Sequence, residues 1–315
     1  QGIGRGIARY FASQGAKVIT NNRKPGSGFL ANFTKDDMPP EDWDEMVKLA
    51  GDAQDTADII RQEGGEAYPF FADVSDAMAA QSMVDFAVEK FGHLDIVVNN
   101  AAGLGGGPIE NITDDQWNFH MSSKMKGTFN LMRSATPVMK EQKYGRFINA
   151  SSEAWLGLIG ESAYSAANAG IVGLTWAASK ELWRFGITAN VYCPQGQSPA
   201  HAVEYNAMLR KIKAMTGKDP DPRILAAVER DHADARGLAP ALAFLASEDG
   251  GYVSGAVFAT YSSGTVKFFS DPAVKATIKR SEEEGPWTQA EIKEAFKNDL
   301  LGEDYVSPAS VSQWG

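Results

Sequence analysis

The stretch Gly2-Ile3-Gly4-Arg5-Gly6-Ile7-Ala8 places a glycine-rich turn directly before a helical pattern, residues 7–14, and a β-rich run, residues 16–20. Glycines at the start of a helix let the backbone approach a phosphate group, whose negative charge is favoured at a helix N-terminus. The same turn also occurs as a plain strand-to-helix connection. Motifs elsewhere in the chain are needed to distinguish a phosphate-binding turn from a plain connection.

Strands and helices continue to alternate along the chain. Apolar, β-rich runs predict strands at 67–71, 94–98, 145–149, 187–192 and 256–260, and helical periodicity covers 78–91, 117–142 and 164–185. Such alternation favours parallel strands joined by right-handed crossovers, and the continuous run Ile96-Val97-Val98 is typical of a buried parallel strand. The sequence therefore predicts an α/β fold with a doubly wound, Rossmann-like parallel sheet.

Composition narrows the functional class. The 315 residues are 43% hydrophobic, which suits one large α/β domain, and the net charge of −10 argues against a nucleic-acid-binding surface. Because Cys193 is the only cysteine, neither an intrachain disulfide nor a cysteine-ligated zinc site is expected, and the four histidines show no metal-ligand spacing. With no membrane-spanning run and no signal peptide in the sequence, we expect a cytoplasmic protein without nucleic-acid or membrane partners.

Four motifs occur in an order and spacing that resemble the short-chain dehydrogenase/reductase superfamily. They are Gly2-Ile3-Gly4, Asp73-Val74, Asn99-Asn100-Ala101-Ala102-Gly103, and Tyr164 in a helix start rich in alanine and serine. The resemblance covers residues 1 to about 265 and implies hydride transfer between a nicotinamide cofactor and a ketone or secondary alcohol. This sequence departs from the family's Asn-Asn-Ala-Gly motif, because its glycine, Gly103, comes one residue later.

The resemblance also assigns the cofactor-binding positions. They are Gly2, Ile3, Gly4, Asn22, Arg23, Asp73, Val74, Asn100, Ala101, Tyr164, Pro194 and Gly196. An acidic residue after the strand at 16–20 would bind the ribose hydroxyls of NAD, whereas Arg23 suits the 2′-phosphate of NADP. NADP is therefore favoured and NAD stays possible, since Arg23 is alternatively a solvated loop cation.

The family's catalytic set comprises a serine, a tyrosine, a lysine and an asparagine, and two of these are exchanged here. Tyr164 occupies the tyrosine position, but the lysine expected four residues later is Asn168. The family's asparagine, three residues before Gly127, is Lys124. We hypothesise that Lys124 supplies, from the neighbouring helix, the cation that lowers the pKa of Tyr164. The alternative is a surface lysine in a protein that binds the cofactor without turnover.

The catalytic serine is one of two neighbours. Counting forward from the strand at 145–149 selects Ser152, whereas counting back thirteen residues from Tyr164 selects Ser151; we favour Ser152 because strand ends are better fixed than loops. The adjacent Glu153 either orients a donor or faces water. Cys193 precedes the family's Pro-Gly turn, which Gln195 interrupts, and is interpreted as a small core residue.

The remaining segments set the domain organisation. Residues 1–270 form the predicted dinucleotide-binding domain, in which the family's first strand is absent from the given chain. Residues 24–52 resemble an insertion after the family's second strand, which is the strand predicted at 16–20 in this chain. Residues 197–234 correspond to the substrate-covering region, and residues 271–315 form a C-terminal extension with an amphipathic helix at 289–297.

Substrate and assembly follow from the same resemblance. The insertion and the tail are similar to reductases related to the hydroxyacyl-CoA dehydrogenase part of multifunctional β-oxidation enzymes, which points to a keto or hydroxyacyl thioester or another bulky alcohol or ketone. The rival class is a cofactor-binding scaffold or pseudoenzyme. A homodimer or homotetramer is expected through the helices at 117–142 and 164–185, where Trp176 and Trp183 share a face and suit either that contact or the core.

Overall fold

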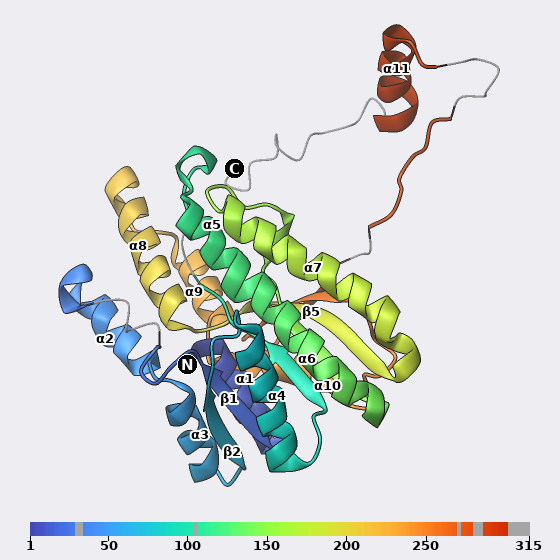
Figure 1. Ribbon diagram of the computed structural model, residues 1–315. Helices are drawn as coiled ribbons and strands as arrows, with labels where there is room; N and C mark the ends of the chain where they lie inside the picture. Colours follow the sequence, from blue (N-terminus) through green and yellow to red (C-terminus); the bar gives the residue numbers. More distant parts are fainter. Residues whose placement is uncertain (29–33, 104–105, 270–271, 280–285, 302–315) are drawn as a thin grey trace. The chain divides into compact units, whose positions relative to one another are not determined.

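The computed structural model describes residues 1–28, 34–103, 106–269, 272–279 and 286–301. Contacts between residues divide the chain into two compact units, Gln1–Phe269 and Ser270–Gly315. Parallel strands covered by helices make up the first unit (Figure 1).

Seven strands form two sheets in the described part of the chain. Strands β3 (Ile96–Asn99), β4 (Gly145–Ala150), β5 (Ile187–Gln195) and β6 (Val257–Tyr261) pair in parallel, in that order. Strands β1 (Val18–Asn22) and β2 (Ala67–Phe71) form a separate parallel pair. All six predicted strands are present, within one or two residues of their expected starts, and the doubly wound α/β prediction is confirmed.

The edge strand corrects the expectation of a wholly parallel sheet. Strand β7 (Val266–Phe269) pairs antiparallel with β6 through a tight turn in which the Tyr261 amide donates to the Thr265 carbonyl at 2.9 Å. Its first three residues are exposed, so it lacks the apolar burial pattern by which a strand is recognised in a sequence.

Helices bury both faces of the five-stranded sheet, because successive strand residues point to opposite sides. Phe147 packs with α4 (Ala77–Phe91), α6 (Gly127–Gln142) and α7 (Ser162–Leu182). The next residue, Ile148, packs with α1 (Gly2–Ser13) and α10 (Ala239–Ala246) on the other face. Helix α3 (Ala53–Gln62) covers the β1–β2 pair.

The helix predicted at 117–142 is divided into three parts. It begins as α5 (Asp114–His120), continues as the π-helical segment η4 (Met121–Lys126) and ends as α6. π-Helical turns are rare and occur frequently at functional sites. Figure 1 shows this long element running alongside α7.

The helix predicted at 164–185 comprises α7 and a 3₁₀ turn, Trp183–Phe185. Trp176 donates its indole N–H to the Gly255 carbonyl at 2.9 Å and packs in the core, whereas Trp183 is 52% exposed. The two tryptophans therefore have different environments, and Trp183 is the more exposed of the two.

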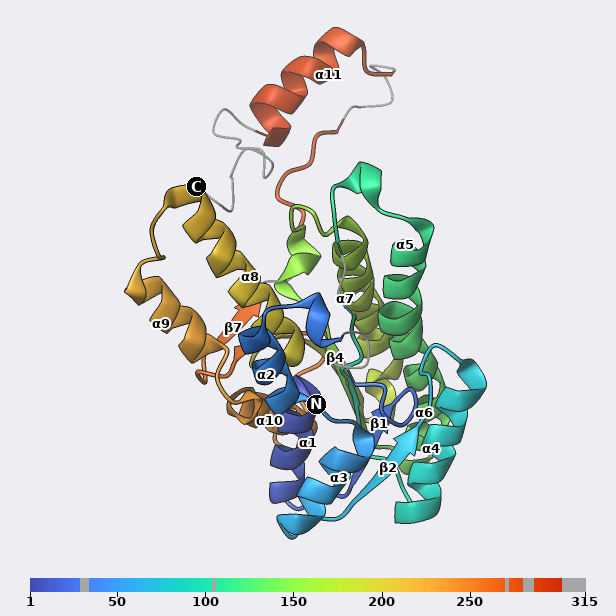
Figure 2. The ribbon, with the colours of Figure 1, turned by 90° about the vertical axis from the view of Figure 1, so that its left-hand side faces the viewer.

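The predicted insertion contains a 3₁₀ turn, Lys35–Asp37, and helix α2 (Pro40–Leu49), while residues 29–33 lie outside the described residues. Helix α2 lies beside α8 (Pro199–Thr216), which forms the predicted covering region together with α9 (Pro222–Asp231) (Figure 2). The Asp42 carboxylate, 1% exposed, accepts hydrogen bonds from the Arg210 guanidinium at 2.5 and 3.1 Å and from Asn206 at 2.9 Å. Because a buried carboxylate requires such partners, this contact anchors the insertion to the covering region.

The second unit contains α11 (Gln289–Ala295), which continues as a π-helical turn, Phe296–Leu301. Thr288 and Glu291 form a reciprocal capping box at the start of α11. The helix predicted at 289–297 thus begins where α11 begins. Among the described residues, no helix has the length and apolar character needed to span a membrane.

Candidate active site

Lys124 and Tyr164 meet between η4 and α7. The Lys124 side chain is buried, with 2% of the residue exposed, and its Nζ lies 5.7 Å from the centroid of the Tyr164 ring. The one-turn π-helical segment carries Lys124 on its buried side. The amine therefore lies beside the phenol ring and not in solvent.

Burial controls the charge of this lysine. It lowers the pKa of Lys124 from the usual 10.5 to about 8, and the nearby Cys193 partly opposes the shift. The ammonium form still predominates at neutral pH. A cation beside a phenol stabilises the phenolate, which is the property that a tyrosine acid/base needs.

Asn168 has a different role from the lysine it replaces. It is fully buried, and its Nδ2 donates to the Tyr164 carbonyl of its own helix at 2.8 Å. Its Oδ1 has no hydrogen-bond partner among the described residues. The Asn168 amide is turned back along α7 and brings no charge to the phenol.

The two candidate serines differ in exposure. Ser151 is buried, its Oγ donates to the Asn168 carbonyl at 3.1 Å, and its amide donates to the Tyr192 carbonyl at 2.8 Å. Ser152 is half-buried and caps the 3₁₀ turn η5 (Glu153–Leu156), accepting from the Ala154 amide at 3.3 Å. Ser152 is therefore the more exposed of the two serines.

His120, a residue that the family motifs do not assign, also contacts Tyr164. It is buried, and its ring meets the Tyr164 ring edge-on at a centroid distance of 5.5 Å. His120 precedes Lys124 by four residues, a spacing that places two helical side chains on one face. That spacing is the signal that points to it in the sequence.

The glycine loop opens α1 in a form that suits a phosphate. Helix α1 has no side-chain cap and no acidic residue in its first turn, so no side chain of that turn competes for its first amides. Gly2 has φ +50°, and a Cβ on Gly4 would lie 3.0 Å from Asn100 Nδ2. Asn100 is held by the Tyr192 hydroxyl, which donates to its Oδ1 at 2.7 Å. This backbone cradle fits the pyrophosphate of a dinucleotide.

The other predicted cofactor residues follow the strand ends. Ile3 is half-buried against the α1–α10 core, and Ala101 is exposed after β3. Pro194 and Gly196 lie at the end of β5. The nearby Ser198 approaches the glycine loop, since a Cβ added to Gly2 would lie 3.0 Å from the Cβ of Ser198. The glycine loop, Asn100 and the β5 turn are thus brought together at the carboxyl ends of parallel strands, where dinucleotides bind in open α/β sheets.

Two further pairs of predicted cofactor-binding residues lie at or after the ends of β1 and β2. Asp73 accepts from the Ser75 amide at 2.9 Å, and Val74 is buried in the core. Asn22 ends β1 half-buried, and Arg23 is exposed with no hydrogen bond or ion pair to any described residue. The Arg23 guanidinium is therefore available to an incoming anion.

The shifted glycine of the Asn-Asn-Ala-Ala-Gly motif has a steric reason. A Cβ on Gly103 would lie 1.9 Å from a ring carbon of Phe119 in α5. A side chain at position 103 would therefore require the Phe119 ring to move.

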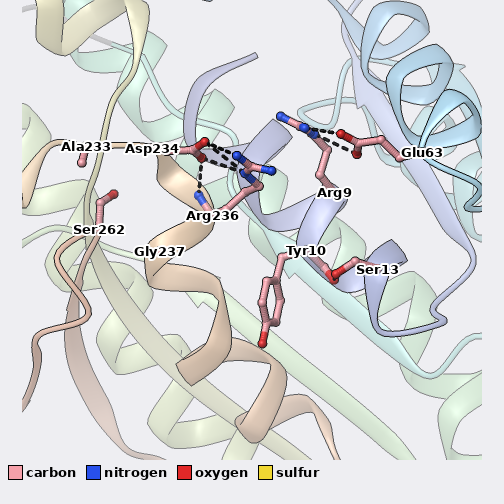
Figure 3. Close-up of a pocket in the computed structure, with 9 residues that line it drawn as sticks. All are labelled: Arg9, Tyr10, Ser13, Glu63, Ala233, Asp234, Arg236, Gly237 and Ser262. Carbon is pink, nitrogen blue, oxygen red and sulfur yellow. Dashed lines mark hydrogen bonds and ion pairs between the residues drawn. The ribbon is translucent and has the colours of Figure 1, made fainter.

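A cavity of about 600 Å³ lies elsewhere, over α1 (Figure 3). Its two arginines are already paired: Arg9 Nε donates to Glu63 at 3.0 Å, and Arg236 forms an ion pair with Asp234 at 2.7 Å. None of the residues that line it belongs to the predicted catalytic set. Among the described residues, no group of three or more acidic, histidine or cysteine side chains could hold a metal ion.

Comparisons with known proteins agree with this architecture. The family model described as short chain dehydrogenase matches residues 45–209. The chain is 30% identical over 257 residues to "(2S)-[(R)-hydroxy(phenyl)methyl]succinyl-CoA dehydrogenase subunit BbsD" of Thauera aromatica, covering 81% of this chain and 89% of that protein. It is 29% identical over 316 residues to "Hydroxyacyl-CoA dehydrogenase ChsB1" of Mycobacterium tuberculosis, covering 96% and 86%. A short chain dehydrogenase from Mycobacterium avium superposes with a TM-score of 0.69 at 27% identity, covering 94% of this chain and 89% of that one.

The chain belongs to the short-chain dehydrogenase/reductase family. It is an oxidoreductase that acts on CH–OH groups, and its family uses a nicotinamide cofactor. The resemblance inferred from the motifs is confirmed, including the relationship to hydroxyacyl-CoA dehydrogenases.

Proposed function

We propose that the protein is an NADP-dependent dehydrogenase/reductase that interconverts keto and hydroxyacyl thioesters, using Tyr164, Lys124 and Ser152 as its catalytic set. The observation that carries the proposal is the buried Lys124 ammonium, 5.7 Å from the Tyr164 ring centroid. It supports a reciprocal exchange of lysine and asparagine between two neighbouring helices.

Each catalytic side chain has a separate task in this proposal. The bound nicotinamide supplies or accepts the hydride. In the reduction direction, Tyr164 gives its phenolic proton to the carbonyl oxygen as negative charge develops there, and Ser152 donates a hydrogen bond to the same oxygen. Lys124 stabilises the phenolate that remains. Gly2, Gly4 and Asn100 would hold the pyrophosphate.

The substrate class rests on the relatives, since two of them are named as dehydrogenases of CoA thioesters. The test follows consumption of NADPH with a short series of 3-oxoacyl-CoA thioesters and, as comparison, the corresponding simple ketones. We expect turnover to be faster with the thioesters. Tight NADPH binding without turnover on either series would contradict the proposal and favour the rival class, a cofactor-binding scaffold.

The preference for NADP rests on Arg23. We expect Arg23→Ala to weaken NADPH binding by about tenfold or more, because a charged hydrogen bond to a phosphate contributes about 1.5–3 kcal/mol, and to leave NADH binding nearly unchanged. Lys24→Ala, an equally exposed neighbour, is the control. Titrating each variant with both cofactors measures the effect, and equal losses for NADPH and NADH would contradict the assignment.

The proposal includes a homodimer or homotetramer that uses the α5–α6 element. Large apolar side chains are exposed along it: Trp117 at 44%, Phe119 at 37%, Met125 at 38% and Phe129 at 43%. We expect light scattering to give twice or four times the chain mass, and Phe129→Asp to lower that mass. Met78→Asp, at a 79% exposed site on α4, should not. A monomeric wild-type protein would contradict this assembly.

A further inference from the structure

A polar network connects the turn after β4 with the ends of three other strands. The Glu153 carboxylate accepts a hydrogen bond from the Tyr261 hydroxyl at 2.8 Å and one from Gln195 Nε2 at 3.4 Å. Lys267 Nζ lies 3.6 Å from the other carboxylate oxygen and also donates to the Tyr261 hydroxyl. The partners of Glu153 thus come from β5, β6 and β7.

We propose that Glu153 is a positioning residue, and that this network holds the Ser152 turn in place against the turn at the end of β5. Ser152 caps η5, of which Glu153 is the first residue, so the two neighbours belong to the same turn. A hydroxyl that must meet a carbonyl oxygen in a fixed geometry needs such support from neighbouring hydrogen bonds. The inference rests on the proposed role of Ser152.

The network is partly shielded from water, unlike an ordinary surface ion pair. Tyr261 is 8% exposed, the Glu153 side chain is 32% exposed and the Lys267 side chain is 55% exposed. Exposed ion pairs contribute little, but the hydrogen bond from the buried Tyr261 phenol is directional and is shielded from water. We therefore assign the main part of the anchoring to Tyr261 and a smaller part to Lys267.

The same network explains two features that the family resemblance does not. Gln195 interrupts the family's Pro-Gly turn, and its side chain reaches Glu153. Strand β7 contributes little burial but carries Lys267, and its Phe269 meets Trp155 of η5 edge-on at 5.7 Å. Gln195 and strand β7 therefore both contact the turn that contains Ser152 and Glu153.

Amide hydrogen exchange tests the inference without cofactor or substrate. The amides of Trp155 and Gly157 donate within the turn, to Ser152 and Ala154 at 2.9 Å each. We expect about tenfold faster exchange of the peptide spanning residues 152–158 in Glu153→Ala and a smaller increase in Tyr261→Phe. Glu153→Gln, which keeps an acceptor for Tyr261, should be close to wild type. Tyr252→Phe, at a 75% exposed site, is the control.

Kinetics then separate positioning from folding. We expect Glu153→Ala to lower kcat about tenfold or more with little change in the KM for cofactor, and Glu153→Gln to recover most of it. Unchanged exchange in Glu153→Ala, or a loss that glutamine does not recover, would overturn the inference. Faster exchange in Glu153→Ala alongside a wild type without turnover would uphold the anchoring and contradict the proposed function instead.

Discussion

Replacing Lys124 by methionine is expected to lower kcat/KM for carbonyl reduction by about 10²–10⁴-fold, the usual contribution of positioned acid/base catalysis. Methionine keeps the length and apolar stem of the side chain, so the buried site stays filled. What is lost is the ammonium beside the Tyr164 ring. Steady-state kinetics with saturating NADPH measure the loss.

The same variant is expected to gain stability. Burial lowers the pKa of Lys124 to about 8, which means that the folded state disfavours the charged form relative to the unfolded state. At pH 7 the methionine variant avoids that cost. A residue whose removal raises the melting temperature while removing activity is retained for function.

The pH dependence of stability provides an independent check. Between about pH 8 and 10.5 the unfolded chain keeps the Lys124 proton that the folded chain has released. The free energy of unfolding of the wild type therefore gains a component that rises with pH over this range. The methionine variant lacks this component. Wild-type turnover in Lys124→Met, or identical pH profiles of stability, would contradict the role of Lys124.

Exchanging both residues back, Lys124→Asn with Asn168→Lys, is expected to retain far more activity than either single change. Lys124→Asn alone leaves Tyr164 without a cation, and Asn168→Lys alone adds a second ammonium to a buried region that already holds one. The double variant again has one lysine, at the position the family pattern gives it. Because the two sites act on one phenol, their effects are strongly non-additive.

A complete double-mutant cycle measures this coupling, with kcat/KM and melting temperature recorded for all four proteins. Asn168→Ala is the matched control, since it removes the hydrogen bond to the Tyr164 carbonyl without adding charge. Additive losses, with the double variant no better than the worse single one, would show that the two positions are independent.

The sequence predicted the fold well where burial leaves a repeating pattern. Strand β3 contains the continuous apolar run Ile96-Val97-Val98, which is typical of a parallel sheet, and its predicted start lies two residues from the observed one. Strand β7 was missed because its exposed residues follow no such pattern, and the π-helical turn at 121–126 was missed because it adds only a local change in helical repeat.

The site was predictable as far as local motifs reach. Lys124, Tyr164 and Asn168 are assigned because short motifs within single helices resemble those of the family, and their catalytic roles stay predictions. Glu153, Tyr261 and Lys267 lie up to 114 positions apart in the chain and meet only through strand pairing. No single segment of sequence contains that information.

The anchored carboxylate of Asp42 has a consequence for engineering. Because Arg210 and Asn206 of α8 hold this carboxylate, helix α2 of the insertion and helix α8 are coupled through a buried contact. Redesigning α8 alone to widen the range of substrates would remove Arg210 and leave the buried Asp42 carboxylate without its cation. Libraries that vary 40–49 and 199–216 together are the ones that keep folded members.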